Sequence, residues 1–409
     1  MTIASIIERD RSSTGAKSLP QLFSDNAAQL GNRPCMREKH RGIWRQWTWQ
    51  QVFEDVRALA AAFHELGVKP GDRMIILGEN RPRLYWAMSA AQWLGSTPVP
   101  LAADTPADAL ARVVAELDVS VVVVDGSGQY EKLLRAGEAI RPKLNKVIVD
   151  NLAGLEVSEA LPVNPMDDLI TAGRQAGSPT KAKLDQALSS RQLQDCVADL
   201  PFSHITLGSP AESWSQMQSV RVTHADAIEY ADQDLKAHEL GNKDDVIAYL
   251  PFGSWADLYG SHILPLTTGV TVNFPEAADT IAVDIREIGP TIHFIPDWAI
   301  KKLRDAALAR AEGAGGARLA KSIEACRVRR NPWTLLLQVV LLWPMRDVLG
   351  LSRTRIMFIV GDPKRGAVDF LTALGIPSVQ SKEPRARAIA TSNLLSSARA
   401  GISIPSVVH

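Results

Sequence analysis

TWQQVFEDVRALAAAFHELGVKPGDRMIIL, residues 48–77, contains the signals of one helix and of the strand that follows it. Thr48 and Gln51 have the spacing of a capping box, in which each side chain bonds the other residue's backbone N–H at a helix start. Gly67 ends the helical pattern, and a turn leads into the wholly apolar run Met74–Leu77. The apolar residues between these signals share one helical face: Trp49, Val52, Phe53, Val56, Leu59, Ala60, Phe63 and Leu66. The stretch predicts an amphipathic helix that packs on a core and leads into a buried strand.

The same alternation of helix and strand continues along the chain. Short apolar strands separated by amphipathic helices are typical of a mostly parallel sheet covered by helices on both faces. The sequence therefore predicts the α/β class, with two α/β subdomains. The expected helices of the first are 84–94, 107–117 and 131–140, and its further strands are 98–101, 119–124 and 146–149. The expected strands of the second are 202–207, 246–250, 270–274, 291–295, 355–360 and 376–379.

Composition divides the chain into four expected segments. Residues 1–150 form the first α/β subdomain. Residues 151–199 are rich in Ala, Ser, Gly, Asp and Gln, which favours a variable, exposed linker. Residues 200–381 form the second subdomain, and residues 382–409 have no firm period, which predicts a poorly ordered tail.

The overall composition excludes several classes of protein. The 45 Lys and Arg residues equal the 45 Asp and Glu residues, so no excess basic charge indicates a nucleic-acid partner. The three cysteines show no metal-binding or CxxC spacing, which fits a reducing compartment. The N-terminus is not typical of a signal peptide, and the longest apolar run, 333–345, falls short of the roughly 20 residues that span a bilayer. We expect a cytoplasmic protein with at most peripheral membrane contact.

The stretch FSHITLGSPAESWSQMQSVRVTH, residues 202–224, has the pattern of a phosphate-binding site. It predicts a strand, a small-residue loop that starts at Gly208, and a helix that opens near Thr223; free backbone N–H groups and a helix dipole favour an anion there. Against this interpretation, Pro210 has no N–H to donate, and Arg221 is the sole cation before the helix. The alternative is a polar surface loop that joins a buried strand to a helix.

The residues 47–101 resemble the N-terminal part of the adenylate-forming (AMP-binding) superfamily, and within it the long-chain fatty acyl-CoA synthetases. The likeness continues through 107–125, 245–266, 269–296 and 344–375. It implies an enzyme that activates a fatty acid with ATP to an acyl-adenylate and transfers the acyl group to coenzyme A. ATP, Mg²⁺ and CoA are therefore the cofactors that the resemblance implies, and a long-chain fatty acid is the implied ligand.

Two of the family's motifs are matched in part by this sequence. Thr206, Gly208 and Ser209 match its phosphate loop and Thr223 matches the helix start, but the loop's lysine is absent. Gly361 matches the glycine of the adenine-binding segment.

Two further motifs depart from the pattern. Ser254 stands where the family has a histidine near the acyl tunnel, and the family's magnesium-binding glutamate motif is replaced by SVQSKEP, residues 378–384. Glu383 and Arg221 remain as candidate catalytic residues, with a solvated acid as the alternative for Glu383. The chain ends at His409, before the family's ribose-binding aspartate and its small C-terminal domain, so the resemblance implies that these parts are missing.

The sequence thus favours a long-chain acyl-CoA synthetase-like protein that is catalytically impaired or inactive and retains acyl binding. The resulting ATP site is vestigial and no metal-ligand set is predicted. One alternative is a divergent fatty acid–CoA ligase that uses Thr206, Gly208, Ser209, Thr223 and Arg221 on phosphate. Another is a non-catalytic scaffold or interaction protein. The oligomeric state is left open.

Overall fold

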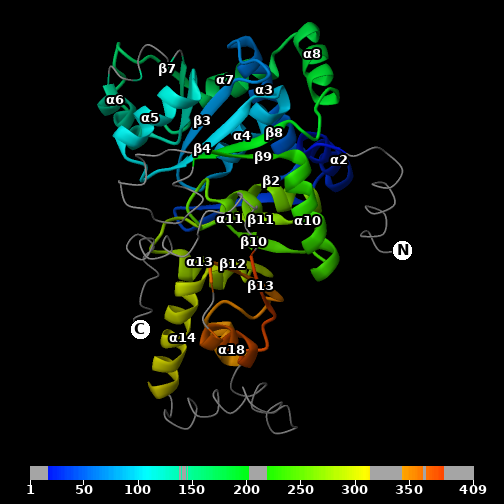
Figure 1. Ribbon diagram of the computed structural model, residues 1–409, viewed down its shortest axis with the longest axis vertical. Helices are drawn as coiled ribbons and strands as arrows, with labels where there is room; N and C mark the ends of the chain where they lie inside the picture. Colours follow the sequence, from blue (N-terminus) through cyan, green and yellow to red (C-terminus); the bar gives the residue numbers. More distant parts are fainter. Residues whose placement is uncertain are drawn as a thin grey trace.

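The computed structural model describes residues 17–137, 140, 144, 146–201, 219–313, 343–362 and 365–381. Within these residues the strands form a seven-stranded sheet, a five-stranded sheet and a two-stranded ribbon. Figure 1 shows the five-stranded sheet in the upper half of the molecule and the seven-stranded sheet in the lower half, with the ribbon between them. The prediction of an α/β fold with mostly parallel sheets is confirmed.

The five-stranded sheet is parallel throughout and has the strand order β4-β3-β5-β6-β7. Its strands are β3 (Arg73–Gly78), β4 (Thr97–Ala102), β5 (Val121–Val124), β6 (Lys146–Val149) and β7 (Val163–Pro165). The helices that follow them in the chain are α4 (Pro82–Leu94), α5 (Ala107–Leu117), α6 (Ser127–Ala136) and α7 (Met166–Arg174). Residues 74–77 and 121–124 are all buried, as expected for central strands of a parallel sheet with helices on both faces.

The seven-stranded sheet has the order β14-β13-β12-β10-β11-β1-β2 and is parallel except for the hairpin β1–β2. Its strands are β1 (Pro34–His40), β2 (Ile43–Thr48), β10 (Asp245–Ile247), β11 (Thr271–Phe274), β12 (Ile292–Pro296), β13 (Ile356–Val360) and β14 (Ser378–Gln380). The associated helices are α2 (Leu19–Leu30), α10 (His224–His238), α11 (Trp255–Asp257), the π-helix η3 (Leu258–Ile263), α12 (Leu264–Thr268), α13 (Ile281–Ile288), α14 (Asp297–Gly313), α17 (Trp343–Val348) and α18 (Arg365–Ala373). The N-terminal hairpin therefore belongs to the sheet built mainly from the second half of the chain.

Helix α3 (Trp49–Glu65) packs into the core that both sheets share. The predicted capping box is present: Thr48 Oγ1 accepts from the Gln51 N–H at 3.2 Å, and Gln51 Oε1 accepts from the Thr48 N–H at 2.9 Å. Trp49 is fully buried and its ring lies 6.0 Å from that of Phe23 on α2. The helix therefore begins where the sequence predicts and buries the predicted face.

The segment expected to be an exposed linker contains regular structure, which corrects that expectation. It holds β7, α7, α8 (Ser178–Ser189) and β8 (Cys196–Pro201). A Cβ on Gly173 of α7 would lie 1.9 Å from the Ala58 carbonyl oxygen, so α7 packs directly on α3. Small residues permit this approach and leave little apolar periodicity in the sequence, which is why the pattern is faint. Residues 151–154 and 159–160 are exposed as expected.

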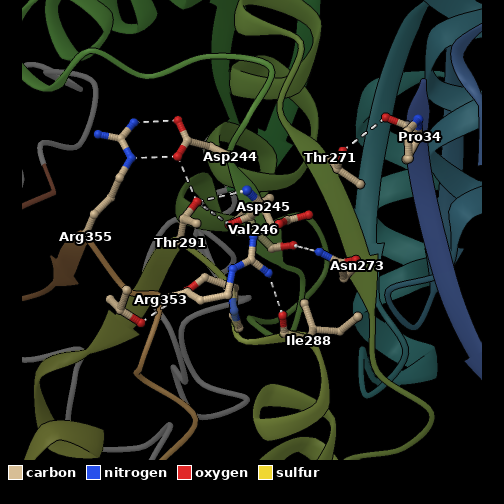
Figure 2. A network of polar contacts seen from close by, with 12 residues as sticks. Pro34, Asp244, Asp245, Val246, Thr271, Asn273, Ile288, Thr291, Arg353 and Arg355 are labelled. Atoms are coloured by element: carbon tan, nitrogen blue, oxygen red, sulfur yellow. Dashed lines mark hydrogen bonds and ion pairs between the residues drawn. The ribbon is translucent and has the colours of Figure 1, made fainter. Parts of the chain in front are cut away.

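Salt bridges fasten the amino ends of the strands in the seven-stranded sheet (Figure 2). Arg355 donates to both carboxylate oxygens of Asp244, and the Thr291 hydroxyl donates to Asp244 at 2.8 Å. Arg353 donates to Asp245 at 2.9 Å. These contacts join β10, β12 and β13 at the edge opposite the carboxyl ends of the same strands.

Several predicted features lie outside the described residues. They are the strand 202–207, most of the apolar run 333–345 and the tail from residue 382. Among the described helices, none has the length and apolar character needed to cross a bilayer.

Candidate functional site

The strand order of the seven-stranded sheet indicates where a ligand would bind. After β10 the chain forms β11 on one side of it, then returns to form β12 on the other side. In open parallel α/β sheets, ligands bind beyond the carboxyl ends of the strands at such a switch point. The candidate site is therefore the carboxyl edge between β10 and β12, bordered by the loop of residues 248–254.

This loop is held by a close backbone approach to the five-stranded sheet. Gly253 has φ +79°, and a Cβ there would lie 2.5 Å from the Pro100 carbonyl oxygen on β4. Glycine is thus required both by conformation and by space. Ser254 is buried and its hydroxyl accepts from the Asp257 N–H at 3.3 Å, which caps α11. The residue in the place of the family's histidine is therefore a buried helix cap.

A buried carboxyl group lies directly beneath the loop. Asp257 Oδ1 accepts from the Tyr85 hydroxyl at 2.7 Å and from Asn80 Nδ2 at 2.8 Å. Asp257 Oδ2 accepts from the Gly253 N–H at 3.1 Å, and the Ser261 hydroxyl also bonds to this carboxyl. Burial raises the pKa of Asp257 to about 7, against the opposing effect of these hydrogen bonds.

The ends of β13 and β14 supply neutral groups to the same edge. Gly361, a predicted cofactor-binding residue, follows β13 with φ +104°. Gln380 Nε2 donates to the Gly361 carbonyl at 2.8 Å, and the Ser381 N–H donates to the Ile359 carbonyl at 2.7 Å. Glu383 lies outside the described residues. The resemblance implies a magnesium-binding acid in this segment. In its described part, the side chains at the edge are the Gln380 amide and the Ser381 hydroxyl.

The start of α10 is saturated by hydrogen bonds within the protein. The N–H of His224 donates to the Asp195 carbonyl at 3.0 Å, and the N–H of Ala225 to the Leu193 carbonyl at 2.8 Å. The Thr223 hydroxyl accepts from the Asp226 N–H at 3.1 Å and donates to the Asp226 carboxylate at 2.6 Å. A carboxylate thus already lies at this helix start, and the described groups there do not fit an additional phosphate.

The remaining predicted site residues fall into two groups. Thr206, Gly208 and Ser209 lie outside the described residues. Arg221 is exposed on β9 (Ser219–Thr223), in register with Asp199 of β8 (Cys196–Pro201). Arg221 and Thr223 are thus on β9, whereas Gly361 follows β13 on another sheet. Within the described residues, no three His, Cys, Asp or Glu side chains are arranged to hold a metal ion.

Sequence reasoning missed the Asp257 cluster. Asp257 is the one acid in the apolar run LPFGSWADLYGSHILPL, residues 250–266. A single acid in such a run indicates a buried, hydrogen-bonded carboxyl, and this signal could have found it. Nothing in the sequence around Tyr85 or Asn80 indicates that they are its partners, because they lie more than 170 residues away along the chain.

Comparison with known proteins shows which family and which relatives this chain resembles. Residues 23–191 match the family model described as AMP-binding enzyme. The chain is 24% identical over 291 residues to the long-chain-fatty-acid–CoA ligase ACSBG2 of Rattus norvegicus, covering 70% of this chain and 42% of the relative. It is 25% identical over 291 residues to ACSBG1 of Bos taurus, covering 68% of this chain and 37% of the relative. The chain spans about two fifths of the length of these curated relatives.

Solved structures share the fold. The inhibitor-bound N-terminal domain of FACL13 from Mycobacterium tuberculosis superposes with a TM-score of 0.63 at 14% identity, covering 90% of this chain and 76% of that one. The A domain of carboxylic acid reductase from Segniliparus rugosus, in complex with AMP and a co-purified carboxylic acid, gives a TM-score of 0.68 at 14% identity. That match covers 91% of this chain and 61% of the other.

Proposed function

Since this chain belongs to the adenylate-forming, AMP-binding superfamily, we propose that it is a long-chain acyl-CoA synthetase-like protein that binds a fatty acid without activating it efficiently. The bound acyl group lies at the carboxyl edge of the seven-stranded sheet. ATP, Mg²⁺ and CoA are the ligands that its relatives imply, and their role in this chain is reduced or absent.

The observation that carries the proposal is the start of α10. The Asp226 carboxylate accepts from both the N–H and the hydroxyl of Thr223, at 3.0 and 2.6 Å. A second anion at this point would meet a fixed negative charge and no free N–H of His224, Ala225 or Asp226. This supports a loss of phosphate binding at the helix start.

The carboxyl edge supports the same conclusion independently. The Gly361 carbonyl is taken by the Gln380 amide, and neither Gln380 nor Ser381 carries the negative charge that Mg²⁺ prefers in a ligand. The sequence between Gly208 and His224 also has no lysine to neutralise a triphosphate.

Fatty-acid binding is supported by the relatives and by the surroundings of the site. The curated relatives are named long-chain-fatty-acid–CoA ligases. Aromatic side chains also lie close to the switch point: the Trp255 and Tyr259 rings stack at 5.8 Å, and Tyr259 meets Phe294 of β12 edge-on at 5.7 Å. These rings are buried in the core beside the switch point, an apolar environment that is compatible with a hydrocarbon chain.

Calorimetry of the full chain tests the proposal. The titrants are magnesium-ATP, a non-hydrolysable acyl-adenylate mimic and palmitate, and ATP-dependent pyrophosphate release is measured in parallel. We expect heat from palmitate, none from magnesium-ATP, and no pyrophosphate above the level of a protein-free control. A micromolar magnesium-ATP heat with pyrophosphate release would establish the divergent ligase instead, and an Arg221→Met variant would then test Arg221. Silence with all three titrants would favour the scaffold.

A further inference from the structure

Asp257 joins the two sheets through an uncharged set of hydrogen-bond donors. It is 2% exposed and receives hydrogen bonds from Tyr85, Asn80, Gly253 and Ser261. Within the described residues, no Lys, Arg or His forms an ion pair with it. Burying an acid among neutral partners costs desolvation free energy, and a well-formed set of hydrogen bonds is needed to offset that cost.

Its partners come from elements of both sheets. Asn80 lies in the turn between β3 and α4, and Tyr85 lies on α4, next to the five-stranded sheet. Gly253 and Ser261 lie in the loop after β10 and in η3, next to the seven-stranded sheet. The Tyr85 ring also packs edge-on against Phe252 of the loop at 5.3 Å. Asp257 therefore fixes the loop of residues 248–254 relative to the first half of the chain.

The local backbone is unusual at this point. The loop holds Gly253 in the left-handed region, and Asp257 is followed directly by the six-residue π-helix η3. π-Helical turns are rare and occur frequently at functional sites. A Cβ on Gly260 of η3 would lie 2.8 Å from the Phe294 ring, so η3 also packs tightly on β12 across the switch point.

We propose that Asp257 is a positioning residue that holds the 248–254 loop in its ligand-binding conformation, with Tyr85 anchoring it to α4. Asp257 contacts no ligand in this scheme and acts through the Gly253 N–H. The inference rests on the proposed function for its consequence on fatty-acid binding. Its consequence for the loop is independent of that function.

Two variants and a matched control test the proposal in the full chain. Tyr85→Phe removes the hydroxyl that donates to Asp257 and keeps the ring packing. Asp257→Asn replaces one accepting carboxyl oxygen with an amide nitrogen, with little change in shape. Tyr130→Phe is the control, because Tyr130 is also fully buried and its hydroxyl bonds elsewhere, to the Leu161 carbonyl at 2.7 Å. Amide hydrogen exchange is followed in residues 248–256 and, for comparison, in α3. Palmitate affinity is measured on the same samples.

We expect Tyr85→Phe and Asp257→Asn to speed exchange in residues 248–256 by about tenfold or more, with α3 unchanged, and to weaken palmitate binding by a similar factor. Tyr130→Phe should leave both readouts at wild-type values. Exchange that stays as in the control, or that rises equally in α3, would overturn the proposal. So would a loosened loop with unchanged palmitate affinity. If wild-type protein binds no palmitate, the proposed function fails, and the exchange comparison still decides the role of Asp257 in the loop.

Discussion

Arg355 and Asp244 join the start of β13 to the start of β10 through two parallel contacts. Arg355 Nε lies 2.6 Å from Asp244 Oδ1, and Arg355 Nη2 lies 2.5 Å from Asp244 Oδ2. A bidentate ion pair of this kind is the strongest geometry for a carboxylate and a guanidinium. Because the pair lies at the amino edge of the sheet, it stabilises the strand order without contacting the candidate site.

Asp244→Asn should therefore lower the free energy of unfolding by about 2 to 4 kcal/mol, since it leaves the guanidinium without its charged partner. Urea denaturation measures the change. Asp185→Asn is the control, because Asp185 pairs with Arg57 at the surface and its side chain is 63% exposed. That variant should cost under about 1 kcal/mol. Equal costs for the two variants would contradict a structural role for the Asp244 pair.

Gly253→Ala tests the close approach of the loop to β4. The left-handed backbone costs about 1 to 2 kcal/mol for a residue with a Cβ, and the contact with the Pro100 carbonyl adds about 1 to 3 kcal/mol. Gly42→Ala separates the two effects, because Gly42 has φ +76° and nothing lies within 4 Å of the place that its Cβ would take. We expect chemical denaturation to show the larger loss for Gly253→Ala. A loss no greater than that of Gly42→Ala would mean that the loop can move away from β4.

Thr223→Ala tests whether this residue caps a helix or binds a nucleotide. A lost N-cap costs about 1 kcal/mol. Thr48→Ala removes the same kind of capping box from α3, away from the candidate site. We expect similar falls in stability for both variants and identical heats with magnesium-ATP. A nucleotide heat that is present in wild type and in Thr48→Ala but absent in Thr223→Ala would assign Thr223 to ligand binding.

Much of the fold could be predicted because its signals are local. The Thr48 capping box and the apolar run 74–77 each specify their element within a few residues, and both are confirmed. The α7 segment has the sequence character of a linker, because its contact with α3 depends on Gly173, which has no side chain and so permits the close approach. The sequence cannot display such a contact, because it depends on the partner helix.

The candidate site was less predictable for the same physical reason. The sequence places Thr223 at a helix start, as the structure does. Its hydrogen bond to the Asp226 carboxylate, which argues against phosphate binding, depends on side-chain geometry that the sequence does not give. The Asp257 cluster joins residues that are 172 to 177 positions apart in the chain. Short-range sequence patterns carry no information about pairings over such distances. These pairings become visible only in the three-dimensional structure.

The stability of the protein should carry the pH signature of a buried acid. Burial raises the pKa of Asp257 to about 7, whereas an aspartate in the unfolded chain titrates near 3.9. Between these values the folded state holds a proton that the unfolded state has released. The contribution of Asp257 to stability is therefore fully present below about pH 4 and is lost as the pH rises towards 7, by up to about 4 kcal/mol.

Asp257→Asn cannot titrate and should remove this dependence. Urea unfolding of both proteins from pH 4.5 to 8 measures it, as the unfolding free energy of wild type minus that of the variant. The difference should fall as the pH rises to about 7 and stay level above it. Buried His262, whose pKa is lowered to about 3 by burial, imposes the opposite slope on both proteins and cancels in the difference. A difference that stays level across the whole range would show that Asp257 is ionised in the folded protein throughout, with its charge stabilised by the four hydrogen-bond donors around it.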